Sequence, residues 1–197
     1  RQAIHLAAPD LRDIDFCVVK RAENFLDSHL QTNHLLLLAD VEMIKEGHEH
    51  ILFCRQNDPL NELWPRFSAT EKIKVIIPGI TSLECGWQIR CRYSDEVPIF
   101  SRDGNTCVLD ARKISSLSLG RISPGERFCP FSLKGKSIKL NDFWTKNGLP
   151  ERARIHWPIL RNENDEIVWV PGYQISDAYK TTSETKEYLL MELFREN

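Results

Sequence analysis

The sequence predicts an α+β protein with a helical N-terminal edge, followed by short, mainly antiparallel strands and a small C-terminal α+β domain. Near the N-terminus, apolar residues recur at the spacing of amphipathic helices. Further along, short apolar runs alternate with clusters of Pro, Gly, Asn and Asp, which is typical of strands joined by turns. A chain of 197 residues is long enough to bury a core, as one large domain or two small ones.

Two helices are predicted at the N-terminal edge. Residues 1–8 are expected to form the end of a helix that Pro9 stops. A second helix is expected to begin at Asp13 or Asp15, either of which can serve as its N-cap, and to continue to about Ser28.

The rest of the chain is predicted to consist mainly of strands. A hairpin is expected around the polar turn Lys45-Glu46-Gly47, and residues 56–72 are expected to form an irregular connection. Residues 139–146 are predicted as a short helix, because Asn147-Gly148 follows them. Residues 188–194 contain too many consecutive apolar residues for a clean alternation, so they are predicted as either a strand or a helix. The other predicted strands lie at residues 35–41, 51–54, 74–77, 87–93, 106–109, 117–122, 157–160 and 167–170.

The cysteines favour a reducing compartment. None of the six belongs to a CxxC pair or a metal-ligand spacing, so we expect reduced, mostly buried thiols in a cytoplasmic protein. His48-Glu49-His50 offers two possible ligands without a third, which predicts a solvated strand edge rather than a metal site. The longest apolar run, Leu35–Ala39, is too short to cross a bilayer. The start at Arg1 resembles mid-protein sequence, so we expect a fragment of a longer protein.

No catalytic motif is recognisable in the sequence. It contains no nucleophile elbow, Walker loop, Rossmann fingerprint or HExxH motif. Gly120, Gly125 and Gly135 do not have the spacing of a phosphate-cradling GxGxxG. We therefore predict no catalytic residue, metal or cofactor in this chain, and a binding module is favoured.

Positive charge is concentrated in one part of a chain whose formal net charge is −2. Residues 120–161 carry nine Lys/Arg and three Asp/Glu, a net charge of +6, whereas residues 1–119 and 162–197 have net charges of −3 and −5. Such a segment is either a solvated loop or a surface whose cations neutralise phosphates and bind nucleic acid in a salt-dependent way. The candidate phosphate contacts are Arg121, Arg127, Lys134, Gly135, Lys136, Lys139, Arg152 and Arg154.

Glycine and aromatic residues refine this hypothesis. Gly135 lies between two lysines, where the missing side chain allows a backbone N–H to approach a phosphate. Lys139 would bring an anion to the first turn of the predicted helix 139–146, where the helix dipole favours it. The aromatic residues are predicted to belong mainly to the core, which suits a double-stranded stem read by shape and backbone. These residues are Phe128, Phe131, Phe143 and Trp144.

Residues 119–143, LGRISPGERFCPFSLKGKSIKLNDF, closely resemble a segment of bacterial tRNA(Ile)-lysidine synthetases. In that family an Arg leads into a PGDRF-x-P box, which a Gly-Lys-rich turn and a K-L-x-D-F helix follow. The resemblance continues in the P-x3-R-x3-P pattern of residues 150–158, in IVWVPG at residues 167–172, and in Thr182-Ser-Glu-Thr185. Two departures are that Glu126 replaces the usual Asp, and that Phe131-Ser132-Leu133 replaces the commoner Leu-Gly-Met.

The resemblance implies a division of labour within a longer enzyme. An N-terminal ATP-pyrophosphatase domain with an SGGxDS loop uses ATP and Mg²⁺ to join lysine to the wobble cytidine of tRNA(Ile). The C-terminal domains hold the tRNA, the last of them near the acceptor stem. This chain contains no SGGxDS, so it resembles the tRNA-recognition half alone, which is not expected to be catalytic. The implied partners are tRNA(Ile), the enzyme's own catalytic domain and, as a possibility, a second copy in a homodimer, with no membrane involved.

The resemblance also suggests domain limits. Residues 1–30 would end a helical substrate-recognition domain, residues 31–95 would form a β-rich connecting region, and residues 96–197 would form the tRNA-binding α+β domain. The boundary is expected at residues 95–105, which contain the turn Asp103-Gly104. The last domain is also similar to one in the β subunit of phenylalanyl-tRNA synthetase.

Two interpretations therefore stand at this point. In the first, the lysines are the main phosphate contacts, supported by the arginines. In the second, the region docks on a protein or on its own catalytic domain, and the basic loop faces carboxylates. Arg127 and Arg154 are the candidates most open to a structural role, such as a pair with a buried Asp142. Trp169 and Tyr173 are predicted to lie in the core.

Overall fold

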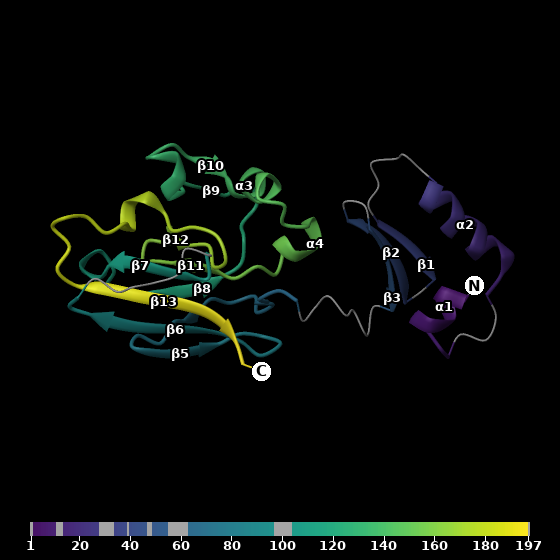
Figure 1. Cartoon of the computed structure of the whole chain (residues 1–197), viewed down its shortest axis with the longest axis horizontal. Coiled ribbons are helices and arrows are strands. Elements are labelled where there is room, and N and C mark those ends of the chain that lie inside the picture. Colours follow the sequence, from purple (N-terminus) through teal and green to yellow (C-terminus); the bar gives the residue numbers. More distant parts are fainter. Residues whose placement is uncertain are drawn as a thin grey trace. The chain divides into compact units, whose positions relative to one another are not determined.

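The computed structural model describes residues 2–10, 14–27, 34–38, 40–46, 49–54, 63–96 and 104–196. The chain divides into two compact units, Arg1–Leu63 (unit 1) and Trp64–Asn197 (unit 2), which are shown in Figure 1.

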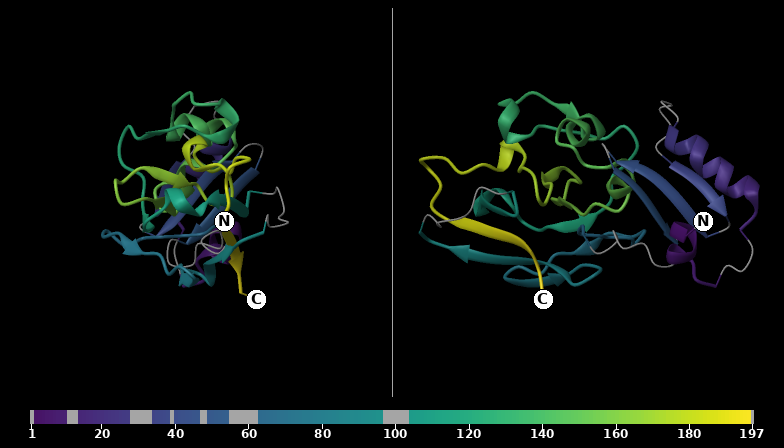
Figure 2. Two further views of the ribbon diagram at one scale, coloured as in Figure 1. Left: turned by 90° about the vertical axis from the view of Figure 1, so that its left-hand side faces the viewer. Right: turned by 45° about the vertical axis from the view of Figure 1, so that its right-hand side comes forward.

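The described residues of unit 1 form two helices and an antiparallel sheet of strand order β1-β2-β3 (Figure 2). Its elements are α1 (Gln2–Ala7), α2 (Phe16–Asp27), β1 (His34–Leu38), β2 (Val41–Glu46) and β3 (Glu49–Cys54). Helix α1 contacts β3 and helix α2 contacts β1, so that Ile4, Phe25 and Leu37 share one core. Both predicted helices are confirmed. No helix of the described residues is long and apolar enough to cross a membrane.

The strand predictions for unit 1 hold with one change. The apolar run at residues 35–41 is two strands, because the chain turns at Asp40 before β2. The predicted hairpin is β2-β3. Several predictions fall outside the described part of the chain: those for His48 and for the side chains of Glu49 and His50, for Asp13 and Asp103, and for residues 56–62 of the predicted connection 56–72.

Unit 2 contains two antiparallel four-stranded sheets that pack face to face (Figure 1). The first has the order β5-β6-β13-β7, and the second has the order β12-β11-β8-β4. The strands of the first sheet are β5 (Gly79–Ser82), β6 (Trp87–Ser94), β7 (Thr106–Asp110) and β13 (Tyr188–Arg195). Those of the second are β4 (Ile73–Lys74), β8 (Ser118–Gly120), β11 (Ile159–Arg161) and β12 (Ile167–Trp169). Residues of both sheets, including Ile89, Leu119 and Leu189, form the main core between them.

The position of β13 explains its unbroken apolar sequence. It is an interior strand, paired with β6 on one side and β7 on the other. Leu189 and Met191 point into the main core, while Tyr188 and Leu190 pack with Val108 in a separate cluster. A strand that is buried on both faces has no polar face, so residues 188–194, predicted as strand or helix, are a strand.

A third layer covers the second sheet. It consists of β9 (Arg127–Phe128), β10 (Ile138–Lys139), α3 (Leu140–Lys146) and α4 (Glu151–Arg154), and the short 3₁₀ turn η3 (Phe131–Leu133) lies between β9 and β10. Two further 3₁₀ turns, η2 (Ala111–Lys113) and η4 (Asp177–Tyr179), lie elsewhere in the unit. Phe143 and Trp144 of α3 pack with Ile159 and Ile167 of the sheet in a second core. The predicted helix 139–146 is thus confirmed, as is the core position of Trp169, while Tyr173 is partly buried against this second core.

The observed division corrects the predicted domain limits. Strands β5 and β6 precede residue 95 and strands β7 and β13 follow residue 105, yet all four belong to one sheet. A boundary at residues 95–105 would therefore cut this sheet, and the chain divides at residues 63 and 64 instead. The turn residues at 95–105 therefore lie between two strands of the same sheet. They were mistaken for a boundary because pairing between distant strands leaves no local trace in composition.

The cysteines differ in exposure, which gives a first testable prediction. Cys17 and Cys85 are exposed, whereas Cys91 and Cys107 are buried, so the expectation of mostly buried thiols is only partly met. Burial raises the pKa of Cys91 to about 12 and that of Cys107 well above its usual value.

Because the thiolate is the reactive form, we expect a thiol reagent at pH 8 to modify Cys17 and Cys85 rapidly and Cys91 and Cys107 only after unfolding. Peptide mapping after timed labelling measures this, and rapid labelling of Cys91 in the folded chain would contradict it.

Candidate nucleic-acid interface

A two-stranded hairpin carries most of the predicted phosphate contacts. Strands β9 and β10 pair so that Arg127 lies opposite Lys139 and Phe128 lies opposite Ile138. Phe128 and Ile138 contribute to the second core, so Arg127 and Lys139 share the opposite face, and both are exposed. We call residues 127–139 the basic hairpin. The prediction that aromatic residues anchor this segment while lysines face outward is confirmed for Phe128, as it is for Phe143 and Trp144 of α3.

The tip of the basic hairpin holds the remaining lysines in the open. Lys134 and Gly135 have backbone φ angles of +47° and +84°, and these two left-handed residues reverse the chain after η3. The Lys136 amide donates to the Leu133 carbonyl at 3.1 Å. A Cβ at Gly135 would meet no heavy atom within 4 Å, so the glycine serves the backbone turn rather than close packing. Lys134, Gly135 and Lys136 are all exposed.

Backbone contacts fix the tip to a neighbouring segment, residues 174–177. The Phe131 amide donates to the Ile175 carbonyl at 3.0 Å, and the Ser132 amide donates to Oε1 of Gln174 at 3.1 Å. Pro130 forms a β-bridge with Ser176. The side chain of Phe131 is nevertheless 53% exposed, so the prediction that it belongs to the core is wrong. The 3₁₀ turn directs this ring outward while the flanking Pro130 is buried.

Two predicted arginines have structural partners. The Arg154 guanidinium donates to the Leu149 carbonyl from Nε at 3.0 Å and from Nη2 at 2.7 Å. Arg127 Nη2 donates to the carbonyl and the hydroxyl oxygen of Ser137, both at 3.0 Å, which links the two strands of the basic hairpin. The proposed pairing of these arginines with Asp142 is wrong, because carbonyl and hydroxyl oxygens take that place.

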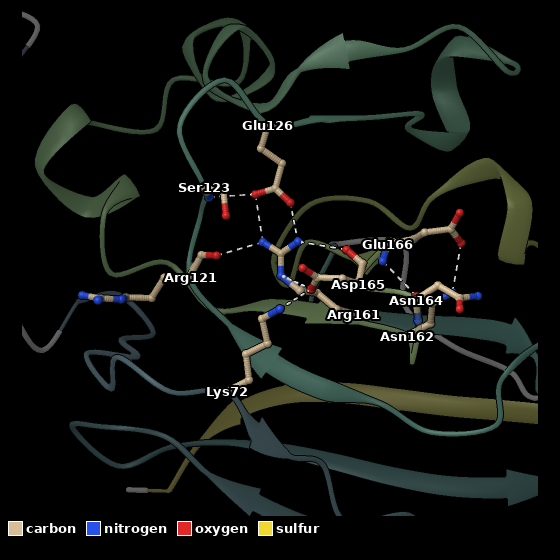
Figure 3. Close-up of polar contacts among 9 residues, drawn as sticks. All are labelled: Lys72, Arg121, Ser123, Glu126, Arg161, Asn162, Asn164, Asp165 and Glu166. Atoms are coloured by element: carbon tan, nitrogen blue, oxygen red, sulfur yellow. Dashed lines mark hydrogen bonds and ion pairs between the residues drawn. The ribbon is translucent and has the colours of Figure 1, made fainter.

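Arg152 and Arg121 also lie outside the basic hairpin. The Arg152 guanidinium lies 4.5 Å from the centroid of the Trp64 ring, a cation–π distance. The Arg121 side chain is half-buried and points away from Arg161 (Figure 3). Burial lowers the pKa of His156, and the positive charges of Arg66 and Arg121 lower it further, against the opposing effect of Glu84. The structure thus brings together Arg127, Lys134, Gly135, Lys136 and Lys139, and it places Arg121, Arg152 and Arg154 elsewhere in unit 2.

Arg161 is a central residue that the sequence analysis missed. It lies at the end of β11, with its side chain 2% exposed, and it forms an ion pair with Glu126 through two nitrogens (Figure 3). Its Nη2 also donates to the Arg121 carbonyl at 2.8 Å, and its Nε lies 3.7 Å from Oδ1 of Asp165. Asp165 in turn accepts a hydrogen bond from Lys72 Nζ at 2.5 Å. The sequence did contain a signal for this ion pair, because a charged residue directly follows the apolar run Ile159-Leu160. An arginine that is buried with such a run needs a carboxylate partner.

Glu126 connects this ion pair to the basic hairpin. Its carboxylate accepts the Ser123 amide at 2.9 Å and closes the turn through Pro124-Gly125. Its carbonyl accepts the amide of Leu140, the first residue of α3, at 2.8 Å. Glu126 therefore ties the start of the basic hairpin, the start of α3 and the second sheet together, and Arg161 holds it in place.

Residues 117–191 match the family model described as the TilS substrate C-terminal domain. These residues form a TilS C-terminal domain. The basic hairpin and the Glu126–Arg161 pair both lie inside this TilS domain.

Curated relatives support the same assignment for the TilS domain. The chain is 29% identical to a tRNA(Ile)-lysidine synthase of Caldanaerobacter subterraneus subsp. tengcongensis over 133 residues, which are 64% of the chain and 28% of that relative. It is 31% identical over 90 residues to a tRNA(Ile)-lysidine synthase of Clostridium perfringens, covering 46% of the chain and 19% of the relative. The chain thus spans about a quarter of the length of these relatives.

A solved structure has the same fold as the larger part of the chain. A crystal structure of a TilS C-terminal domain aligns with a TM-score of 0.57 at 22% identity, covering 64% of the chain and 98% of that structure. The predicted α+β class with mainly antiparallel strands is confirmed.

Proposed function

We propose that this chain is the tRNA-binding C-terminal part of a tRNA(Ile)-lysidine synthase and that it holds the tRNA near the acceptor stem. The observation that supports this most is the basic hairpin of the TilS domain, where Arg127, Lys134, Lys136 and Lys139 are all exposed. A chain of net charge −2 is not drawn to RNA as a whole, so a local cationic surface must supply the attraction.

The arrangement of the basic hairpin suits the phosphates of a stem. Arg127 and Lys139 lie opposite each other on two paired strands, and Lys134 and Lys136 flank Gly135 at the tip. Ammonium groups on exposed stems contact phosphates without reading bases, and the open backbone at Gly135 leaves room for a phosphate oxygen beside it. Contacts of this kind position an RNA helix by its shape and backbone.

The longer enzyme supplies the chemistry in this proposal. The relatives of this chain are named tRNA(Ile)-lysidine synthase, a ligase, and their remaining length accommodates a catalytic domain. That domain uses ATP and Mg²⁺ to join lysine to the wobble cytidine of tRNA(Ile) in the cytoplasm. In this proposal the chain contributes no catalytic group, and its partners are tRNA(Ile), the catalytic domain and a second copy of the enzyme.

A gel shift of the whole chain tests the proposal. At low salt we expect tRNA to be shifted at lower protein concentration than an RNA duplex with the same number of phosphates, because a tRNA offers the stem together with its natural end. We expect the shift to weaken steeply as salt is raised. If neither RNA is shifted at low salt, the proposal fails, and the basic hairpin instead docks on a protein surface that carries carboxylates.

A further inference from the structure

The basic hairpin presents an aromatic ring beside its lysines. Phe131 is 53% exposed and Leu133 is 37% exposed, directly before Lys134 in the chain. The other three aromatic residues of segment 124–144 are buried in the second core, so Phe131 is the ring of this segment that a ligand can reach. Large apolar side chains are costly to leave in water, and a ring next to cations is the combination that sites for unpaired nucleotides use.

The ring is attached to a fixed backbone. Hydrogen bonds from the amides of Phe131 and Ser132 and the bridge between Pro130 and Ser176 hold the first two residues of η3 against residues 174–176. The amide of Asp177 also donates to the Cys129 carbonyl at 2.8 Å. A ring on such a support loses little conformational entropy when it stacks on a flat partner, so stacking retains most of its favourable free energy.

The geometry of RNA decides what such a ring can contact. Inside an A-form stem the bases are stacked on each other, and their faces are closed to a side chain. Unpaired nucleotides expose their faces, and each base has a π-face on which an aromatic ring can stack. Cations alone would serve for a continuous stem, so the exposed ring indicates a ligand with at least one unpaired base next to the phosphates that the lysines hold.

We propose that Phe131 stacks on an unpaired base, and that the RNA bound by the basic hairpin is therefore the junction between a stem and a single-stranded end. This inference rests on the proposed function and specifies the part of the RNA that this surface holds. Lys134, Lys136 and Lys139 contact phosphates on the stem side, and the ring of Phe131 receives the first unpaired base.

Two RNA hairpins that share one stem test the inference. One is blunt, and the other carries a short 3′ overhang with 2-aminopurine as its first unpaired base; both are titrated with the whole chain, and binding is followed by anisotropy. We expect the intact chain to prefer the overhang RNA and to quench the 2-aminopurine fluorescence. Phe131→Ala should weaken binding of the overhang RNA about 5-fold or more, leave binding of the blunt RNA unchanged, and abolish the quenching.

Three further variants separate stacking from other effects. Phe131→Leu keeps an apolar side chain without a π-face and should lose as much as Phe131→Ala, whereas Phe131→Trp should retain the preference. Tyr93→Ala removes a comparably exposed aromatic residue, 55% exposed, from β6 in the first sheet of unit 2. It should change the affinity for neither the overhang RNA nor the blunt RNA. Unchanged thermal unfolding of the Phe131 variants confirms that their fold is intact.

The possible failures are distinguishable. If the intact chain binds both RNAs equally, or if Phe131→Ala weakens both equally or neither, the stacking proposal is overturned while phosphate binding by the lysines stands. If Phe131→Leu binds like the intact chain, the contact is apolar and not stacking, which also overturns it. If the intact chain binds neither RNA at low salt, the proposed function itself fails, and a protein partner covers Phe131.

Discussion

Replacing Arg161 with methionine is expected to lower the free energy of unfolding of unit 2 by about 3 kcal/mol. The guanidinium is almost fully buried, and it binds the Glu126 carboxylate, the Arg121 carbonyl and Asp165 at once. Methionine fills much of the same volume, but it leaves the Glu126 carboxylate without its cation. Removing one partner of a buried pair is costly for this reason, even where replacing both partners is not.

Urea denaturation at neutral pH, followed by tryptophan fluorescence, measures this loss. Lys72→Met is the matched control, because Lys72 bonds Asp165 at the exposed margin of the same network and should contribute less than about 1 kcal/mol. Combining Arg161→Met with Glu126→Gln should cost less than the sum of the two single changes, since no unpaired charge remains. An Arg161→Met variant within about 1 kcal/mol of the intact chain would contradict a structural role for this pair.

Replacing Lys134, Lys136 and Lys139 together with glutamine is expected to weaken tRNA binding about 100-fold at about 50 mM salt. The three ammonium groups lie on the exposed face and tip of the basic hairpin, and each is proposed to displace a counterion from one phosphate. Glutamine keeps a polar side chain of moderate length but removes the charge. Because all three positions are exposed, we expect the free energy of unfolding to change by less than about 0.5 kcal/mol.

A second triple variant controls for net charge. Changing Lys74, Arg92 and Lys186 to glutamine removes the same number of positive charges, but from exposed positions of unit 2 outside residues 120–161. Filter binding or anisotropy with tRNA compares the two variants at one salt concentration. We expect the control to lose less than about 5-fold. Equal losses in both variants would mean that the lysines act through overall charge, not through contacts made by the basic hairpin.

Local signals predicted α3 and the burial of its aromatic residues, but not the strands β9 and β10. Asn147-Gly148 correctly marked the end of α3, and the usual burial of aromatic side chains correctly placed Phe128, Phe143 and Trp144 in the core. A helix end of this kind depends on residues close in sequence, where capping is decisive. Phe131 was misplaced because the general tendency of aromatic residues to be buried does not register the 3₁₀ turn that directs this ring outward.

Features that depend on distant pairing could not be predicted. Glu126 and Arg161 are 35 residues apart, and neither residue by itself reveals that the two meet under the hairpin. Likewise, β13 closes a sheet with strands from before and after residues 95–105, so a stretch with local turn signals was mistaken for a domain boundary. Strand order is set by the burial of whole faces, and composition does not record it.

The salt dependence of tRNA affinity tests the central claim, that lysines of the basic hairpin contact RNA phosphates, most directly. The slope of the logarithm of the association constant against the logarithm of salt concentration is measured for the intact chain and for the variant with Lys134, Lys136 and Lys139 replaced. If each lysine neutralises one phosphate of a stem, the slope of the variant is shallower by about 2.7, since each contact contributes about 0.9. Equal slopes for the two proteins, whatever their affinities, would contradict the claim.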